Sequence, residues 1–381
     1  MVVVRASLVL LVLWTGCQKS KDAPEAQTTE GEAPKIVAPL PRCARGVEPL
    51  PPTIERGVCV AHNYQRGGSK GYGSATSEAT LQELRALGVD SVSLTPFGFM
   101  QRLDEPTVHS IGDYRAGETD SRIVREIKAA KALGLRIMLK PHLWIVDGQW
   151  RGHIDFESDS KWTTWFDAYE DWLLHYADLA EAHGVEFLVV GVELRTTEAR
   201  LESRWRRLIR KVRRRYKGKI TYSANWDDAG ALPWWDAVDY VGVQFYPPLA
   251  KAPGARTEEV RRYLDARLDE VAALSARAER PVLFTEVGFR SDADALVRPH
   301  AWPGRSDDAS VDEETQAIGY AEFVAAVRER RWVAGVYWWK WFTDPNTAEE
   351  GPRGFSPRGK PAESVLRAAY GGNCDAPNSG R

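Results

Sequence analysis

The chain has 381 residues, of which 43% are hydrophobic and 27% charged, a composition typical of a soluble globular protein. Its formal net charge of −2 gives no electrostatic reason to expect nucleic acid or another polyanion as a partner. The 15 tryptophans are the unusual feature of the composition. Indole rings in a cleft stack on the faces of sugars, whereas ordinary core and surface packing is the alternative explanation.

The first 17 residues predict a targeting segment. MVVVRASLVLLVLWTGC has one arginine before an apolar run that is too short to span a membrane, as in a signal peptide. Gly16-Cys17 resembles a bacterial lipobox and predicts lipidation of Cys17, although Trp14 stands where that motif usually has leucine. Plain secretion with loss of Cys17 is the alternative.

Residues 18–42 contain no aromatic side chain and predict a disordered tether ahead of a folded domain over 43–376. We therefore expect an exported protein, lipid-anchored to a bacterial membrane in the periplasm or at the cell surface. Export permits disulfides, and a closed barrel would bring Cys43 and Cys374 together, so we expect these two to pair. Cys59 lies in an apolar strand pattern and is expected to be a buried thiol.

Within the folded part, strand patterns alternate with amphipathic helical patterns. The predicted strands are 58–63, 90–97, 136–145, 186–193, 219–226, 239–246, 281–288 and 333–341. Helices are predicted over 77–87, 120–133, 161–183, 199–216, 257–279 and 313–330. Gly88, Gly134, Gly184 and Gly218 each precede a strand, as expected of glycines that end helices. Eight such alternations predict a single-domain α/β fold, a closed (β/α)₈ TIM barrel.

A doubly wound open sheet is the rival architecture, and it usually carries a glycine-rich phosphate loop after its first strand. Here the first strand leads into HNYQRGGSKGYGS, which fits that spacing only loosely and has no helix directly behind it. The basic run over 204–219 keeps helical apolar spacing and predicts a solvated helix face. Neither feature indicates a nucleotide or nucleic-acid site.

Two glutamates each end an apolar strand pattern: Glu193 in EFLVVGVELRT and Glu286 in PVLFTEVGFRS. Carboxylates in such positions lie at the rim where barrel enzymes keep their chemistry. Hydrolysis of a glycosidic bond needs two carboxyl groups, one protonated and one ionised. The structural alternative is a pair of rim salt bridges, with Arg195 or Arg290 as the partners.

The third predicted strand ends in KPHLWI, where Lys140, His142 and Trp144 alternate and so share one face. This face predicts a wall of a substrate site, with a core histidine and a snorkelling lysine as the alternative. His62 and His142 raise the question of a metal, but no HxH, HExxH or cysteine cluster accompanies them, and we expect neither metal nor cofactor.

Other strand ends supply further candidate substrate contacts. Tyr246 is placed to donate a hydrogen bond to the nucleophile, or else to carry a solvated hydroxyl. Strict alternation puts Trp339 and Trp341 on the face toward the barrel mouth and Trp338 against the helices. The remaining candidates are Asn63, Asn225 and Trp226, together with His300 and Trp302 in the loop 291–312.

Six segments, in order from about residue 57 to 342, resemble glycoside hydrolase family 113, in the retaining clan A of (β/α)₈ barrels. They are LKPHLW with GQWRG, VVGVELRTTE, ITYSANW, VGVQFYPPL, LFTEVGFRS and VYWWKW. The resemblance implies Glu193 as acid/base, Glu286 as nucleophile, no metal, and hydrolysis of β-1,4-linked mannan or a related glycan. Many clan members place Asn before the acid/base to contact the sugar 2-hydroxyl; here Val192 stands there, and Asn225 is the candidate replacement.

The expected function is therefore retaining hydrolysis of β-1,4-glycosidic bonds in a polysaccharide or oligosaccharide, with an endo-acting β-1,4-mannanase favoured. Two alternatives stay open at this point. One is a non-catalytic surface glycan-binding lipoprotein on an inactive barrel. The other is a hydrolase of the same fold that acts on an α-linked or peptidoglycan-like substrate.

Overall fold

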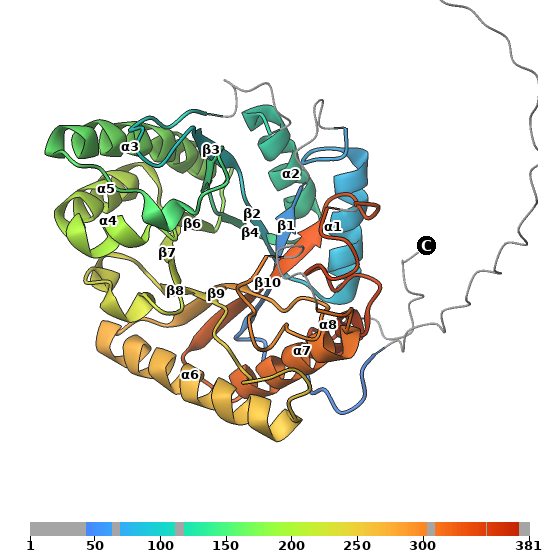
Figure 1. The fold of residues 1–381 in the computed structure, drawn as a ribbon. Coiled ribbons are helices and arrows are strands. Elements are labelled where there is room, and N and C mark those ends of the chain that lie inside the picture. Colours follow the sequence, from blue (N-terminus) through green and yellow to red (C-terminus); the bar gives the residue numbers. More distant parts are fainter. Residues whose placement is uncertain (1–42, 63–68, 111–117, 303–308, 348, 373–381) are drawn as a thin grey trace, which may run out of the picture. The chain divides into compact units, whose positions relative to one another are not determined.

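The computed structural model describes residues 43–62, 69–110, 118–302, 309–347 and 349–372, which belong to one compact unit, Pro39–Arg381. Parallel strands close into a barrel in the order β1-β10-β9-β8-β7-β6-β4-β2 (Figure 1). The predicted (β/α)₈ barrel is confirmed. The barrel strands are β1 (Glu55–Ala61), β2 (Ser91–Leu94), β4 (Arg136–Leu139), β6 (Phe187–Val192), β7 (Lys219–Asn225), β8 (Val241–Phe245), β9 (Val282–Val287) and β10 (Val333–Phe342).

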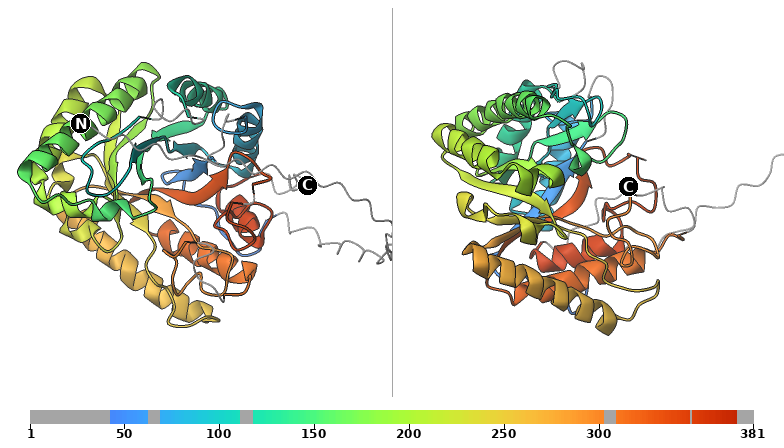
Figure 2. Two further views of the ribbon diagram at one scale, coloured as in Figure 1. Left: turned by 45° about the horizontal axis from the view of Figure 1, so that its top comes forward. Right: turned by 60° about the vertical axis from the view of Figure 1, so that its left-hand side comes forward.

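Helices form the layer outside the barrel (Figure 2). They are α1 (Ala75–Leu87), α2 (Asp120–Ala132), α3 (Asp159–Ala182), α4 (Arg195–Arg200), α5 (Glu202–Arg215), α6 (Thr257–Ala278), α7 (Glu313–Arg328) and α8 (Pro361–Ala369). The helix predicted over 199–216 is broken at Leu201 into α4 and α5, and the short α8 had no predicted counterpart. Between β7 and β8 the described chain makes only the 3₁₀ turns η3 (Ala229–Ala231) and η4 (Trp235–Ala237).

The strand predicted over 136–145 is two strands. After β4 the chain continues as β5 (His142–Ile145), which pairs with β3 (Phe97–Met100) in a separate two-stranded sheet. Pro96 and Pro141 stand between the barrel strands and this sheet. Proline has no N–H to continue a ladder, so both strands leave the barrel at the same level. As a result, His142 and Trp144 lie on an extra layer at the barrel mouth.

Two apolar clusters divide the core. The smaller one consists of inward-facing strand side chains and includes Cys59, Met138 and Tyr337. The larger one lies between strands and helices and holds most of the buried tryptophans. Trp338 stacks on Tyr320 of α7 with ring centroids 3.9 Å apart, as predicted for an outward side chain.

Of the cysteines, Cys59 is a free, fully buried thiol, as predicted, and burial raises its pKa to about 12. Cys43 is disulfide-bonded. Cys374 lies outside the described residues, so the Cys43–Cys374 pairing stays a prediction. Residues 1–42, with Cys17, the signal segment and the tether, also lie outside them. Among the described helices, none combines the length and apolar character needed to cross a bilayer.

The barrel has no room for a side chain at Gly242 in β8. A Cβ there would lie 2.0 Å from the backbone oxygen of Tyr222, which cannot move aside as a side chain can. Gly242→Ala should therefore lower the free energy of unfolding by about 1–3 kcal/mol. Gly230→Ala is the matched control, because nothing lies within 4 Å of its added methyl group. Urea denaturation of both variants measures the difference, and equal stability would contradict the barrel packing described here.

Candidate active site

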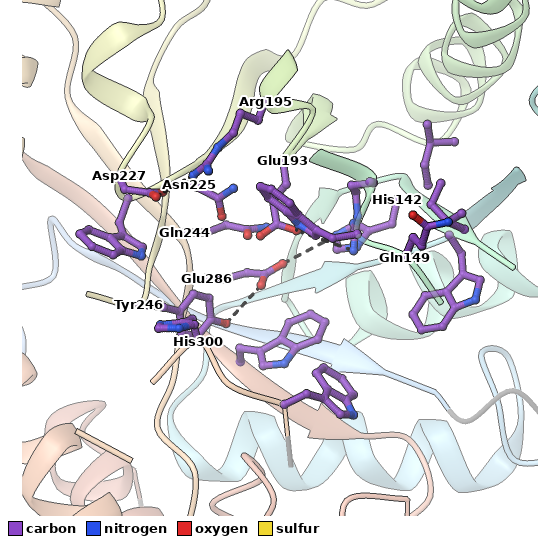
Figure 3. Close-up of a pocket in the computed structure, with 18 of the residues that line it drawn as sticks. His142, Gln149, Glu193, Arg195, Asn225, Asp227, Gln244, Tyr246, Glu286 and His300 are labelled. Atoms are coloured by element: carbon purple, nitrogen blue, oxygen red, sulfur yellow. Dashed lines mark hydrogen bonds and ion pairs between the residues drawn. The ribbon is translucent and has the colours of Figure 1, made fainter. Parts of the chain in front are cut away.

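A cavity of about 560 Å³ opens at the carboxyl ends of the strands, and both candidate glutamates line it (Figure 3). Glu193 follows β6 and Glu286 lies in β9, the fourth and seventh strands of the barrel. The remaining wall comes from the ends of the other strands and the loops behind them. It includes His142, Trp144, Trp150, Arg151, Arg195, Asn225, Trp226, Asp227, Gln244, Tyr246, His300, Trp302, Trp339 and Phe355.

Glu286 is held by one donor on each carboxylate oxygen. Lys140 Nζ lies 2.5 Å from Oε1, and the Tyr246 hydroxyl donates to Oε2 at 3.2 Å. Burial, reinforced by Glu286, raises the pKa of Tyr246, so its hydroxyl remains a donor. Lys140 is itself fully buried and also donates to the backbone oxygen of Thr285 at 3.2 Å. These contacts orient the carboxylate and compensate its charge.

Glu193 has a different environment. Its Oε2 accepts a hydrogen bond from Trp150 Nε1 at 3.3 Å and lies 3.8 Å from Arg151 Nη2. Burial raises the pKa of Glu193 above its ordinary value; Arg151 opposes this and the negative charge of Glu286 adds to it. A raised pKa favours the protonated form, as a general acid requires.

His142 lies beside Glu286 as a neutral ring. Arg151 Nη1 is 3.0 Å from His142 Nδ1, and a guanidinium can only donate, so Nδ1 accepts. The ring proton of the neutral tautomer is then on Nε2, which faces Glu286 Oε1 at 3.7 Å (Figure 3). Burial, together with the charges of Arg151 and Lys140, lowers the pKa of His142 well below its usual value.

Neither Arg195 nor Arg290 forms the alternative rim salt bridge with Glu193 or Glu286. Arg195 pairs with Asp227 at 2.6 Å and with Asp228. Arg290 pairs with Asp292 at 2.8 Å. The candidate glutamates instead contact Trp150, Arg151, Lys140 and Tyr246.

Most predicted substrate contacts lie in the cavity wall. These are His142, Trp144, Asn225, Trp226, Tyr246, Trp339, His300 and Trp302. The Asn225 side-chain nitrogen is buried and has no hydrogen-bond partner among the described residues, which leaves a donor free for a ligand. Asn63 lies outside the described residues. Lys140 is not in the wall. It is fully buried and forms an ion pair with Glu286, in place of the predicted direct contact with substrate.

The prediction that Trp341 faces the barrel mouth is wrong. Val58 pairs with Trp338 and Val60 pairs with Trp341, so β10 has one more residue than β1 over this stretch. Such a bulge reverses the alternation beyond it. Trp341 therefore joins Trp338 in the outer core, fully buried, while Trp339 faces the cavity.

Sequence reasoning missed Trp150, Arg151, Gln244 and Phe355 as wall residues. Gln244 could have been found, because it precedes Tyr246 by two positions and so shares its face. Trp150 and Arg151 lie beyond β5 in a segment without periodicity, where only the matched GQWRG segment marked them. Within the part of the chain that the structure describes, no group of three or more His, Cys, Asp and Glu side chains is arranged to hold a metal ion.

The Lys140–Glu286 pair predicts a large stability effect. Lys140→Met leaves the Glu286 carboxylate buried without its cation and should cost about 3–5 kcal/mol of unfolding free energy at neutral pH. Lys140→Met with Glu286→Gln removes both charges and should recover most of that loss. A double-mutant cycle by chemical denaturation measures the coupling. A Lys140→Met variant as stable as the parent would show that the pair contributes nothing to stability.

Comparison with known proteins agrees with this geometry. The model of Glycoside Hydrolase Family 113 matches residues 62–360. A solved complex of a GH113 β-1,4-mannanase is 26% identical, with a TM-score of 0.73 over 84% of this chain and 99% of that one. The GH113 β-mannanase of Alicyclobacillus acidocaldarius, solved with ManMIm, is 28% identical, with a TM-score of 0.73 over 84% of this chain and 97% of that one. A search among curated proteins gave no match. Because the family model spans most of the chain and both carboxyl groups line one cavity, this protein is a glycoside hydrolase that belongs to Glycoside Hydrolase Family 113.

Proposed function

We propose that this protein is a retaining β-glycosidase that cleaves internal β-1,4 bonds of mannan or a closely related glycan. The observation that carries the proposal is the contrast between two carboxyl groups in one cavity. Glu286 is oriented by Lys140 and Tyr246, whereas burial raises the pKa of Glu193. The similar solved structures are β-mannanases by name, which supports mannan as the substrate class.

The reaction follows from these two environments. Glu286 attacks the anomeric carbon and forms a covalent glycosyl ester, while Glu193 gives its proton to the departing glycosidic oxygen. Glu193 then takes a proton from water, the resulting hydroxide attacks the anomeric carbon, and Glu286 leaves as a carboxylate. Two inversions give net retention.

The same contacts help Glu193 change roles. In the free enzyme, the negative charge of Glu286 is one cause of the raised Glu193 pKa. Once Glu286 is an ester, that charge is gone and the Glu193 pKa falls. Arg151, which lowers the Glu193 pKa, stays in place. Glu193 is therefore more readily ionised in the second step than in the first, and only the ionised form can take a proton from water.

The shape of the wall supports action within a chain. Trp144 and Trp302 are among the most exposed large apolar side chains described, at 46% and 42%. Trp144 follows β4 and Trp302 follows β9, and these strands lie four positions apart in the ring of strands. Exposed indoles from two separated parts of the chain, in the same cavity wall as Glu193 and Glu286, suit a glycan longer than a single sugar unit.

We also infer export with a lipid anchor at Cys17, on the pattern of the first 17 residues alone. The disulfide at Cys43 supports an oxidising compartment.

Removing each carboxyl group tests the assignment. Glu286→Ala should lower turnover by about 10⁴-fold or more, because no nucleophile remains. Azide should then give a glycosyl azide of inverted configuration with Glu286→Ala and of retained configuration with Glu193→Ala. Proton NMR of the products with an activated aryl glycoside reads the configuration. Glu314→Ala, on the exposed face of α7, is the control. Undiminished turnover by Glu286→Ala would refute its role as nucleophile.

The cation beside Glu193 predicts a change in pH dependence. Arg151 lowers the Glu193 pKa, so Arg151→Met should raise that pKa and keep the acid protonated to higher pH. The basic limb of the kcat/KM profile should then move to higher pH. Arg151→Lys should keep the limb near its original place, and the exposed Arg200→Met is the control. An unmoved limb in Arg151→Met would show that Glu193 does not set it.

A further inference from the structure

The backbone at Glu193 adopts a conformation that side chains usually avoid. Its φ is +53°, in the left-handed region. A glutamate there is sparsely populated and persists only where the surroundings hold it. Two hydrogen bonds to neighbouring β7 do so: Glu193 N–H donates to the Ser223 backbone oxygen at 3.0 Å, and Leu194 N–H donates to the Tyr222 hydroxyl at 2.8 Å.

The Tyr222 hydroxyl is itself fixed by Glu198 of α4. It donates its one proton to Glu198 Oε1 at 2.7 Å, so its lone pairs are left to accept the Leu194 N–H. Tyr222 is fully buried and Glu198 is 4% exposed. Burial raises the pKa of Glu198 to about 7, and its carboxyl oxygen can accept this bond whether the group is protonated or not.

The surrounding packing holds the tyrosine ring in one place. Trp205 and Trp234 contact it edge to face, with ring centroids 5.4 and 5.1 Å away. Trp234 Nε1 donates to the Glu198 backbone oxygen at 2.9 Å, which ties the same side chains together. Gly191, two residues before Glu193, leaves room for the ring: a Cβ there would lie 2.6 Å from Tyr222 Cε2.

We propose that Tyr222 and Glu198 are positioning residues for Glu193: the tyrosine hydroxyl, oriented by Glu198, fixes the backbone turn that aims the acid/base carboxyl at the glycosidic oxygen. Neither residue is among those that line the cavity, so both act through Glu193. The inference rests on the proposed role of Glu193. It goes beyond that role because it assigns a positioning function to a buried pair behind the site.

The effect should appear where proton donation matters. A displacement of a reacting group by about 1 Å can cost about 100-fold in rate. Loss of the Tyr222 hydroxyl should therefore slow cleavage of a bond whose leaving oxygen needs a proton. It should hardly slow cleavage when the leaving group departs as a stable anion, because that step does not use the acid.

The experiment compares Tyr222→Phe with the parent on two aryl β-mannobiosides, one with a phenyl and one with a 2,4-dinitrophenyl leaving group. For the phenyl substrate, kcat should fall about 10- to 100-fold with KM nearly unchanged. For the dinitrophenyl substrate, the rate of glycosyl-enzyme formation should fall less than about threefold. This rate is measured from the initial burst of dinitrophenolate. Glu198→Ala should act in the same direction as Tyr222→Phe, and Glu198→Gln, which keeps an acceptor for the hydroxyl, should restore most of the phenyl activity.

Tyr216→Phe is the matched control. Tyr216 is also buried, and its hydroxyl donates to a backbone oxygen, that of Val185, at 2.9 Å, but both residues lie in helix-to-strand turns at the opposite end of the barrel. Tyr216→Phe should lose about as much stability as Tyr222→Phe. The ratio of its rates on the phenyl and dinitrophenyl substrates should stay that of the parent. An equal loss on both substrates in Tyr222→Phe would overturn the positioning role.

A second readout separates this inference from the function on which it rests. If the parent cleaves neither substrate, or if Glu193→Ala shows no dependence on the leaving group, the assignment of Glu193 fails. Amide exchange of Leu194, measured by NMR, still tests the hydrogen bond itself. Exchange should be slow in the parent and in Tyr216→Phe and faster in Tyr222→Phe. Unchanged exchange in Tyr222→Phe would remove the structural basis of the proposal.

Discussion

The ion pair between Lys140 and Glu286 is the interaction on which the site depends. It joins the end of β4 to β9 inside the barrel, with Lys140 fully buried and Glu286 5% exposed. A buried charge costs several kcal/mol of folding free energy unless it is paired. Each residue therefore compensates the charge of the other inside the barrel. The charge of Lys140, after burial and Arg151, also contributes to the lowered pKa of the neighbouring His142. One buried lysine therefore influences both the orientation of the candidate nucleophile and the protonation state of the ring beside it.

Two side chains of one chemical type acquire different properties at the same rim. Glu286 has a lysine and a tyrosine on its two oxygens, whereas Glu193 has an indole N–H and a more distant guanidinium. The contrast comes from the strand ends around each residue, because burial and near neighbours decide which form of a carboxyl group is favoured. Glu193 adds a strained backbone turn, held from behind by a buried tyrosine and glutamate. Strain of this kind is characteristic of functional sites, where the surrounding fold maintains it.

The tryptophans show how one residue type serves two purposes. Trp144, Trp150, Trp226, Trp302 and Trp339 line the cavity, whereas Trp162, Trp165, Trp205, Trp234, Trp338 and Trp341 are fully buried. The buried set is not inert. Trp205 and Trp234 pack against the ring of Tyr222. The Tyr222 hydroxyl accepts a hydrogen bond from Leu194 N–H and so links the outer core to the turn at Glu193. Core packing around β6 and β7 thus helps to hold the backbone at the candidate acid/base.

Local patterns in the sequence determined the alternation of strands and helices, the closed barrel and the two glutamates, because periodicity and strand ends are properties of neighbouring residues. Tertiary structure decided the rest. Only pairing with β1 revealed the extra residue in β10 that turns Trp341 away from the cavity. Only closure of the barrel brought Lys140 to Glu286, 146 positions later in the chain. The prolines at 96 and 141 were visible in the sequence, yet the small sheet beyond them required both strands to be placed side by side. Local order follows from local sequence, whereas partners, burial and the pKa values they set follow from which distant segments meet.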